Sequence, residues 1–425
     1  MNASIGNTLN RIWESTDLWQ DLATLCEFGG RFAGTESEAR AREFLRHRLA
    51  SMGLEVTSHE VPYDGWQRGN ATLTHLASPP RSLPCHSLGR SPATPPDGVT
   101  AEVVDLGRGT EEEFTRRAGK LRGRFALVHH EYMFSTEHVH RRRKYEWAQQ
   151  HGAVGFMIAS HLPGDTLVTG SSSSGTPDAI PALGISQETA AVLTRESGDA
   201  PIVNVKIEVI HQPSVAENLI VDIPGSTPEQ VVLCAHYDGH DLAQSAIDNA
   251  SGVACVLAIA RLLAPRVPSL KRGLRVALFT VEEWGLMGSR EYVDELTAAE
   301  RDNLKLVVNL DAVVGSPRLT ALTSGFDELA PFLRSVSEQL GIALGSHAPM
   351  MANSDHYNFA RVGIPALRLV AGFNEPQSQL RHLLTAGDTL EKISPAELKT
   401  ACYLAAHLVA AGLNGGSAFG TRGSG

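Results

Sequence analysis

The pattern of apolar and polar positions divides much of this chain into short strands and helices. Four runs in its second half are almost continuously apolar and rich in β-branched residues: 219–223, 231–235, 275–281 and 306–310. Such runs are typical of strands that are buried on both faces. Residues 252–263 instead repeat their apolar positions at helical spacing. The alternation predicts an α/β fold, a three-layer sandwich whose mixed, mostly parallel sheet has helices on both faces.

The N-terminal region carries a helix signal followed by a strand signal. Thr35 and Glu38 have the spacing of a capping box at the start of a helix, and Gly53 is a suitable stop. Residues 54–61 alternate enough to predict a strand. The next stretch, 64–100, is rich in Pro, Ser and Gly and is expected to form loops at a domain boundary.

A second, smaller unit follows this boundary. Its strands are predicted at 125–129 and 154–158, and its helices at 145–150 and 187–194. Residues 167–178 are expected to form a flexible polar loop.

Composition narrows the functional classes. The chain has 425 residues, which favours two domains, and its formal net charge of −10 disfavours nucleic acid and anionic membranes as partners. No apolar run approaches the ~20 residues of a membrane span. The first residues show no basic segment followed by an apolar one, so we expect a cytoplasmic protein. The five cysteines are scattered and predict neither disulfides nor a thiolate metal site.

Acidic and imidazole side chains cluster at or near the ends of the apolar runs. The six are His236 and Asp238 in AHYDG, Asp248 in AIDNASG, Glu282 and Glu283 in TVEEWG, and Asp311 in NLDA. A single acid at such a position is usually a solvated loop residue. Because parallel strands release side chains into one crevice at their carboxyl ends, we expect these six to meet at one edge of the sheet.

These residue types suit a pair of divalent cations. Zinc takes imidazole nitrogen and carboxylate oxygen at ~2.0–2.2 Å, and two metals ~3.5–4 Å apart favour a bridging carboxylate. Asp238 can reach back to His236 and fix its tautomer. Asp248, in a tight turn before a helix, is placed to bridge. Glu282 and Glu283 diverge, so one can bind metal while the other stays free as a base.

With these motifs, residues 207–393 resemble the di-zinc exopeptidase family of bacterial leucyl aminopeptidases, carboxypeptidase Q and glutamate carboxypeptidase II. The N-terminal stretch FGGRFAGTESEARAREFLRHRLASMGLEV is also similar to that family. The middle unit resembles a protease-associated domain through GRFALV, GAVGFMI and IPALGIS. The resemblance implies a discontinuous peptidase domain, 1–65 and 206–414, and a protease-associated insert, 66–205. Residues 415–425 are rich in Gly and Ser and are expected to form a disordered tail.

The resemblance implies two zinc ions per chain. His236 and Asp311 would bind one zinc, Glu283 would bind the other, and Asp248 would bridge both. It also implies a cis peptide after the bridging residue, between Asp248 and Asn249.

The resemblance further implies a base. Glu282 would take a proton from the attacking water and return it to the leaving amine. Asp238 would support catalysis by orienting His236.

The family's fifth ligand is a histidine in a Tyr-His-Thr-x-x-Asp-Thr stretch. Residues 381–389 here read RHLLTAGDT. Aligned on the Thr and Asp, the ligand position holds Leu384, and His382 lies two residues earlier. His382 becomes a ligand if the loop shifts; without such a shift the second zinc lacks this nitrogen.

Three further residues lie near the motifs. His240, in AHYDGHD, is expected to be an exposed residue at the rim of the cleft. Asp355 and His356, in NSDHYNF, resemble the family's Ser-Asp-His-x-x-Phe. They either support the ligands and substrate or serve as a cap and a core histidine.

The sequence predicts a zinc-dependent aminopeptidase or related exopeptidase that acts on a peptide or small amide, with homo-oligomerisation left open. A carboxypeptidase would need a basic clamp, for which Arg368 and Arg381 are candidates. One alternative is a peptidase-like binding protein without turnover, which Leu384 favours. Another is a single-zinc acyl transferase like glutaminyl cyclase, which the presence of His236 together with the Glu-Glu pair disfavours.

Overall fold

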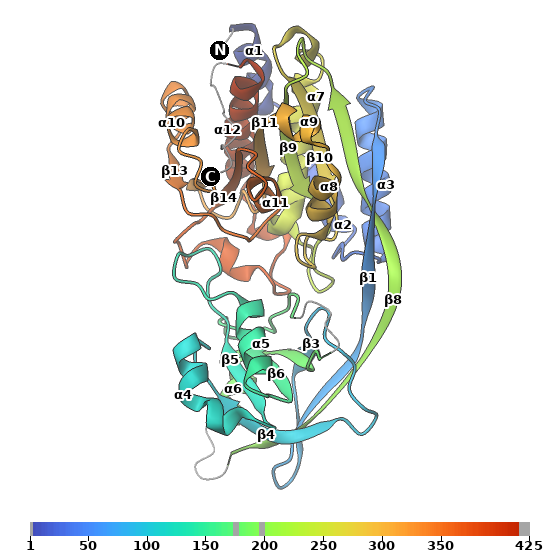
Figure 1. Ribbon diagram of the computed structural model, residues 1–425, viewed down its shortest axis with the longest axis vertical. Coiled ribbons are helices and arrows are strands. Elements are labelled where there is room, and N and C mark those ends of the chain that lie inside the picture. Colours follow the sequence, from blue (N-terminus) through green and yellow to red (C-terminus); the bar gives the residue numbers. More distant parts are fainter. Residues whose placement is uncertain (1–2, 173–177, 195–199, 416–425) are drawn as a thin grey trace. The chain divides into compact units, whose positions relative to one another are not determined.

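The computed structural model describes residues 3–172, 178–194 and 200–415, which divide into two compact units (Figure 1). The first unit comprises Met1–Tyr63, Val215–Leu383 and Asp388–Gly425, and the second comprises Asp64–Ser214 and Leu384–Gly387. The second unit is larger than the predicted insert because strand β8 (Ile202–Ile223) runs as one element through both units.

The first unit is built on a mixed, mostly parallel sheet in the order β13-β12-β14-β11-β9-β10-β8. Its other strands are β9 (Gln230–His236), β10 (Gly273–Phe279), β11 (Leu304–Leu310), β12 (Leu319–Leu322), β13 (Leu344–His347) and β14 (Ala366–Ala371). β9 pairs in parallel with β10 and β11, and β11 with β14. β8 is antiparallel to β10, and β12 is antiparallel to β14. The predicted fold class is confirmed.

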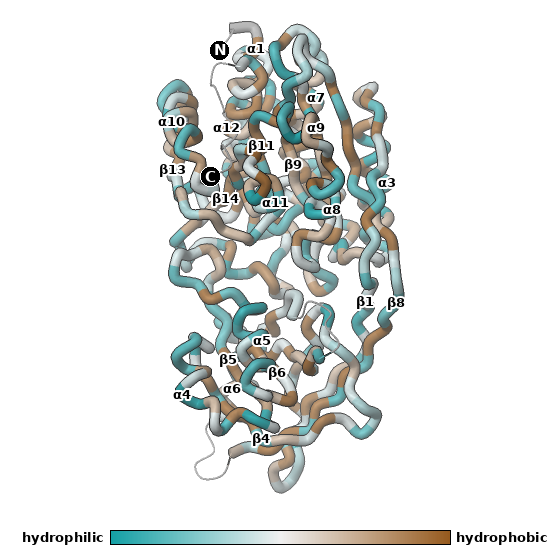
Figure 2. The backbone as a smooth tube through the Cα atoms, in the orientation of Figure 1, coloured by the Kyte–Doolittle hydropathy of each residue, from teal (hydrophilic) through white to brown (hydrophobic). Residues whose placement is uncertain are grey.

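Helices cover both faces of this sheet. They are α1 (Ala3–Leu9), α2 (Asp17–Glu27), α3 (Glu36–Ser51), α7 (Ser251–Leu263), α8 (Met287–Glu295), α9 (Ala298–Asn303), α10 (Leu329–Leu340), α11 (His356–Ala360) and α12 (Pro395–Leu413). α2, α7 and α12 form one packed group, while α11 contacts α8, β11 and β14. Residues 231–236 of β9 are all buried, which requires cover on both sides, and Figure 2 shows the apolar character of these central strands.

Helix α7 is the apolar helix that the sequence predicts at 252–263. Together with the turn before it, the window Ala246–Leu263 is long and apolar enough to cross a membrane by composition alone, which the sequence reading did not anticipate. Within the fold 83% of that window is buried, as in the core helix of a globular unit.

The predicted capping box at the start of α3 forms only in half. Thr35 Oγ1 accepts a hydrogen bond from the Glu38 backbone N–H at 3.3 Å. The Glu38 carboxylate does not complete the box, because its Oε1 accepts the Tyr237 hydroxyl at 2.8 Å. Glu38 therefore ties α3 to the segment that follows β9.

The second unit has its own small sheet, in the order β4-β5-β6-β7-β3, with β4 also paired to β8. Its strands are β1 (Thr57–His75), β2 (Arg81–Leu83), β3 (Cys85–Ser87), β4 (Val99–Asp105), β5 (Phe125–His129), β6 (Gly155–Ala159) and β7 (Ala182–Ile185). Its helices are α4 (Glu111–Leu121), α5 (Arg141–Gln150) and α6 (Gln187–Thr194). β4 to β7 pair in parallel, and β3 is antiparallel to β7.

The expectation of loops over 64–100 is wrong for much of that range. β1 continues to His75, and β2 and β3 follow. β1 alternates buried and exposed positions along much of its length, and β8 and β2 supply its hydrogen-bonding partners. Residues 173–177 of the predicted polar loop and 416–425 of the predicted tail lie outside the described residues.

All five cysteines are free, as the sequence predicts, and all except the half-buried Cys85 are buried. Burial raises the pKa of the Cys26 and Cys85 thiols to about 12, which keeps them protonated at neutral pH.

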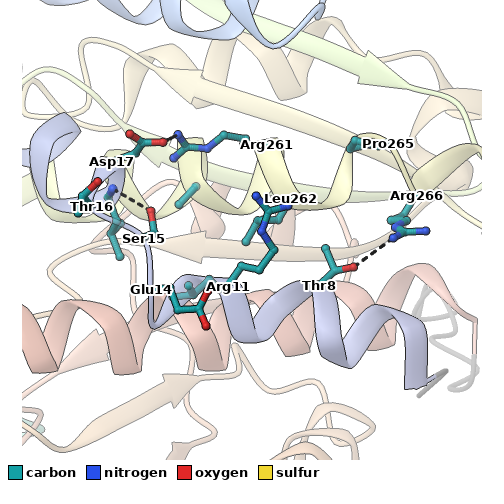
Figure 3. Close-up of a pocket in the computed structure, with 13 residues that line it drawn as sticks. Thr8, Arg11, Glu14, Ser15, Thr16, Asp17, Arg261, Leu262, Pro265 and Arg266 are labelled. Carbon is teal, nitrogen blue, oxygen red and sulfur yellow. Dashed lines mark hydrogen bonds and ion pairs between the residues drawn. The ribbon is translucent and has the colours of Figure 1, made fainter.

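A pocket of ≈ 540 Å³ lies in the first unit between the N-terminal segment and the end of α7 (Figure 3). Arg11 and Glu14 contribute to its lining, and an ion pair between Asp17 and Arg261 lies at one end. None of the six predicted site residues lines this pocket, so it is separate from the candidate chemistry.

Candidate metal centre

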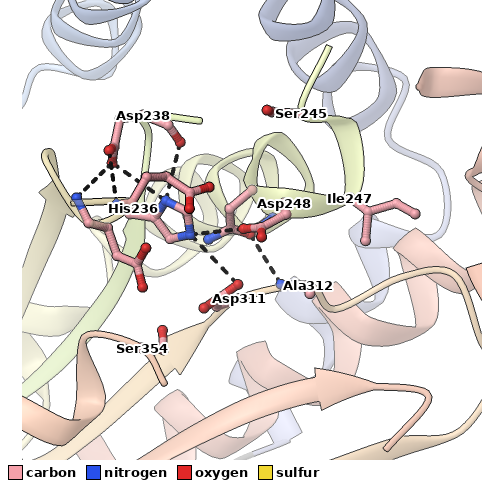
Figure 4. Close-up of polar contacts among 12 residues, drawn as sticks. His236, Asp238, Ser245, Ile247, Asp248, Asp311, Ala312 and Ser354 are labelled. Atoms are coloured by element: carbon pink, nitrogen blue, oxygen red, sulfur yellow. Dashed lines mark hydrogen bonds and ion pairs between the residues drawn. The ribbon is translucent and has the colours of Figure 1, made fainter. Parts of the chain in front are cut away.

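The six predicted site residues all lie at the carboxyl-end edge of the first unit's sheet. His236 is the last residue of β9, and Asp238 follows it by two positions. Glu282 and Glu283 come just after β10, and Asp311 directly follows β11. Asp248 lies in a single turn, Ala246–Ala250, that leads into α7. Figure 4 shows His236, Asp248 and Asp311 pointing toward one another.

His236 is the centre of this cluster. Its Nε2 lies 3.1 Å from Asp248 Oδ1 and 3.6 Å from Asp311 Oδ1. Ligand atoms of His236, Glu282 and Asp311 all lie within 4.8 Å of one another, and so do those of His236, Asp248 and Glu283. Ligands of one tetrahedral zinc are about 3.3 Å apart, so each set is compact enough to hold an ion after small adjustments.

Several buried polar atoms of the cluster make no hydrogen bond to the described part of the chain. They are His236 Nε2, Glu283 Oε1 and Asp311 Oδ1. Buried polar atoms normally find a partner, and an ion is one way of satisfying them. The donor set, imidazole nitrogen and carboxylate oxygen, is the one that zinc accepts.

The electrostatics of the cluster reflect crowded negative charge. Burial raises the pKa of Glu282 well above its ordinary value, and the like charge of Glu283 adds to this effect. Burial also raises the pKa of Glu283. Burial alone would lower the pKa of His236, but the carboxylates around it, Glu282 foremost, raise it well above its ordinary value. The cluster therefore favours added positive charge, whether protons or a cation.

Asp311 differs because it has a cationic partner. Although its burial favours the neutral acid, the Arg368 guanidinium lowers the pKa of Asp311. Arg368 Nη2 lies 3.1 Å from Asp311 Oδ2, and both side chains are buried. Arg368 is thus engaged inside the site and does not offer the exposed basic clamp considered from the sequence.

Asp238 organises two neighbouring segments. Its carboxylate accepts the backbone N–H groups of Glu282 at 3.2 Å and Glu283 at 3.3 Å. It also lies 3.5 Å from His236 Nδ1, which is closer, at 3.2 Å, to the Asp238 backbone carbonyl. Asp238 thus fixes the Glu-Glu turn with its side chain and faces His236 with both its carboxylate and its carbonyl.

Asp388 supports the turn that carries Asp248, a role that the sequence reading did not assign. Its carboxylate accepts backbone N–H groups from Ile247 at 2.7 Å and from Asp248 at 3.2 Å. Burial raises the pKa of Asp388 to about 7. The peptide bond between Asp248 and Asn249 is cis, as the family resemblance implied.

Arg31 supports the loop between Asp238 and Asp248 and was also missed. Its guanidinium is fully buried. It donates to five backbone carbonyls, those of Leu25, Gly29, Tyr237, Gln244 and Ser245. A hint was available, because this arginine follows Gly29-Gly30 in the motif that resembles the family. At Gly30 a Cβ would meet the His240 carbonyl oxygen at 2.0 Å, so only glycine fits there.

The two uncertain histidines do not lie where the sequence suggested. His240 was expected to be exposed, but only 4% of its surface is accessible, and its Nε2 lies 2.8 Å from Glu283 Oε2. His382 ends the short 3₁₀ helix Gln379–His382, where its ring accepts a hydrogen bond from Arg381 at 3.4 Å. His382 belongs to neither set of potential ligands found among the described residues.

Asp355 and His356 are completely buried at the start of α11. Burial raises the pKa of Asp355 to about 7 and lowers that of His356 to about 3. The charge of His236 acts on Asp355, so these residues lie near the cluster without joining either set of potential ligands.

A mostly parallel sheet whose strand ends gather an imidazole and carboxylates, with no thiolate among them, defines the class of metal-dependent hydrolases. Residues 218–409 match the model of peptidase family M28, and residues 99–193 match that of the PA domain. The chain therefore contains a family M28 peptidase region, residues 218–409, and a PA domain, residues 99–193, and is a hydrolase.

Characterised proteins of both exopeptidase kinds are similar to this chain. Carboxypeptidase Q of Rattus norvegicus is 29% identical over 349 residues, covering 80% of this chain and 72% of that protein. The structure of a peptidase M28 precursor from Shewanella amazonensis matches with a TM-score of 0.80 at 26% identity, covering 99% of this chain and 98% of the other. BSAP, a zinc aminopeptidase from Bacillus subtilis, matches with a TM-score of 0.74 at 26% identity, covering 92% and 93%.

Proposed function

We propose that this protein is a zinc-dependent aminopeptidase that hydrolyses the N-terminal bond of a peptide or small amide, with Glu282 as its general base. The observation that carries this proposal is the convergence of two ligand sets on His236, one with Glu282 and Asp311 and one with Asp248 and Glu283. The similar zinc aminopeptidase supports zinc as the metal.

Each member of the cluster receives a role on this proposal. His236 and Asp311 would hold one zinc, Glu283 would hold a second, and Asp248 would be shared by both. Bound zinc supplies a Lewis acid that polarises the scissile carbonyl and lowers the pKa of water. Asp238 and Asp388 keep the ligand-bearing turns in place through the backbone N–H groups that they accept.

Glu282 is the residue suited to move the proton. Only 8% of its surface is exposed, and burial raises its pKa well above the ordinary value. A carboxyl group with a raised pKa is better suited to take up a proton and pass it on. It takes a proton from the attacking water and delivers it to the amine of the leaving group.

The choice between an aminopeptidase and a carboxypeptidase is inferred from the basic residues near the site. A carboxypeptidase needs a cation that is available to a terminal carboxylate, and Arg368 is only 2% exposed and already pairs with Asp311. The other candidate clamp, Arg381, donates to His382 and to Gln377. Because both arginines already have partners, we favour the aminopeptidase over the carboxypeptidase. A binding protein without turnover is not favoured either, because the proposed base and four of the family's five ligands are all present.

Two substrates and one variant test the proposal. Leucine p-nitroanilide, with a free amine, is expected to be cleaved, and an N-blocked dipeptide with a free carboxylate is not. Glu282→Gln removes the base and should lower kcat by roughly 10²–10⁴-fold, while Glu291→Gln, on the outer part of α8, should leave it unchanged. Chelation should abolish turnover and added zinc should restore it. Cleavage of the blocked dipeptide alone would identify a carboxypeptidase instead of an aminopeptidase. Full activity of Glu282→Gln would show that Glu282 is not the general base.

A further inference from the structure

The position at which the family resemblance calls for a fifth ligand cannot supply one. Leu384 has no donor atom, and its side chain belongs to an apolar cluster of the second unit with Leu88, Val168 and Ala182. Its carbonyl accepts the Thr169 backbone N–H at 2.7 Å. Because the proposed function assigns His236 to the first zinc, Glu283 and Asp248 need a further ligand from elsewhere in the chain if they are to hold an ion of their own.

His240 is the buried histidine that contacts Glu283 and could supply this ligand. Its Nε2 lies 2.8 Å from Glu283 Oε2, and the exposed fractions of the two side chains are 5% and 9%. Two ligands of one tetrahedral zinc lie about 3.3 Å apart. A separation of about 0.5 Å more would therefore give the two atoms the spacing of ligands to one ion. His240 contacts the ligand residues through Glu283 and is itself a member of neither set, so its ring must approach Asp248 if the two are to hold one ion.

The loop that carries His240 is held in place before any ion binds. The backbone N–H of His240 donates to Ser245 Oγ at 2.9 Å. Arg31 donates to carbonyls on both sides of His240, and the absence of a Cβ at Gly30 lets the His240 carbonyl approach closely. A ligand on a fixed loop loses little conformational entropy on binding, which is the usual condition for a tight metal site.

We propose that His240 is the nitrogen ligand of the second zinc, together with Glu283 and the bridging Asp248, and that it takes over the task of the family histidine that Leu384 replaces. This proposal rests on the proposed function above and names a ligand for the same site. His240 and His382 both lie outside the two ligand sets, but His240 contacts Glu283, whereas His382, which the sequence had offered, contacts Arg381.

Zinc content measured by elemental analysis on the full-length protein tests the proposal. The wild-type protein should hold two zincs per chain after dialysis, His240→Ala should hold one, and the matched control His382→Ala should hold two. Two retained zincs in His240→Ala would overturn the proposal. So would one zinc in His382→Ala, or a single zinc in both the wild type and His240→Ala.

A spectroscopic variant covers the case in which His240→Ala fails to fold. In His240→Cys the new thiolate should bind cobalt(II) substituted for zinc and add a thiolate-to-cobalt charge-transfer band in the near ultraviolet. His382→Cys should add none, and the wild-type spectrum corrects for the five native cysteines. A band in His382→Cys and none in His240→Cys would overturn the proposal.

The metal readout separates this inference from the proposed function. Two zincs in the wild type and one in His240→Ala, without cleavage of any peptide, would leave the ligand assignment standing and remove the peptidase assignment. Glu282-dependent cleavage by the wild type, together with two zincs in His240→Ala, would leave the peptidase assignment standing and remove the ligand assignment.

Discussion

The Asp388 carboxylate accepts the backbone N–H of Asp248 at 3.2 Å, which links the C-terminal part of the chain to the proposed bridging ligand. It accepts the N–H of Ile247 as well, at 2.7 Å. Asp388→Ala leaves both buried donors unsatisfied, so we expect a loss of about 1–3 kcal/mol in the free energy of unfolding. We also expect weaker zinc binding, because the turn that carries Asp248 loses its support. Urea unfolding and zinc titration measure both effects, with the exposed Asp327→Ala as the control; unchanged zinc affinity would argue against a supporting role.

Arg31 is expected to be irreplaceable by lysine. Its planar guanidinium donates to five backbone carbonyls, and a single ammonium has only three protons and the wrong geometry for them. Arg31→Lys should therefore lower the free energy of unfolding by more than about 3 kcal/mol, since several buried carbonyls lose their donors. Thermal unfolding measures this loss. Arg116→Lys, at an exposed position of α4, should change stability little, and equal stability of the two variants would contradict the prediction.

Arg368 is expected to set the pH range over which zinc stays bound. Its guanidinium lowers the pKa of Asp311, so the carboxylate remains ionised and able to bind metal in acid. In Arg368→Met the pKa of Asp311 should rise, and zinc should be lost at a higher pH than in the wild type, because protons then compete for the carboxylate. Zinc retention measured in buffers from pH 5 to 8 tests this. The same retention curve for both proteins would show that Arg368 acts only in packing.

His130 is expected to make stability fall in mild acid. Burial lowers the pKa of His130 well below its ordinary value. As the pH falls below about 6.5, the unfolded chain binds a proton at this position and the folded chain does not, so the free energy of unfolding decreases. Its contribution is complete above that pH. Urea unfolding at pH 7.5 and 5.5 should show a smaller pH dependence in His130→Gln than in the wild type, and an identical dependence would contradict the prediction.

The sequence was sufficient for four adjacent strands of the sheet, β8 to β11, and for the six residues near their ends, because both follow from local patterns. Strands β12, β13 and β14 were not predicted. An apolar run predicts a buried strand, and the residues that follow parallel strands lie together at the carboxyl-end edge of the sheet. His240 was misjudged because its burial depends on Arg31 and Gly30, some 200 positions earlier in the chain, and no local pattern records such a contact. Long strands such as β1 were missed for a related reason, since their polar residues face outward while their hydrogen bonds go to a strand far along the chain.

Strands β1 and β8 lead the chain into and out of the second unit, and they pair with each other on the way. They run side by side near Gly69 and Glu208. The PA domain is therefore inserted between two strands that pair with each other. A second, separate segment of the chain, Leu384–Gly387, belongs to the same unit, and Leu384 packs into its apolar cluster. Removing the PA domain would therefore need changes at two places, the paired strands and the segment after Leu383.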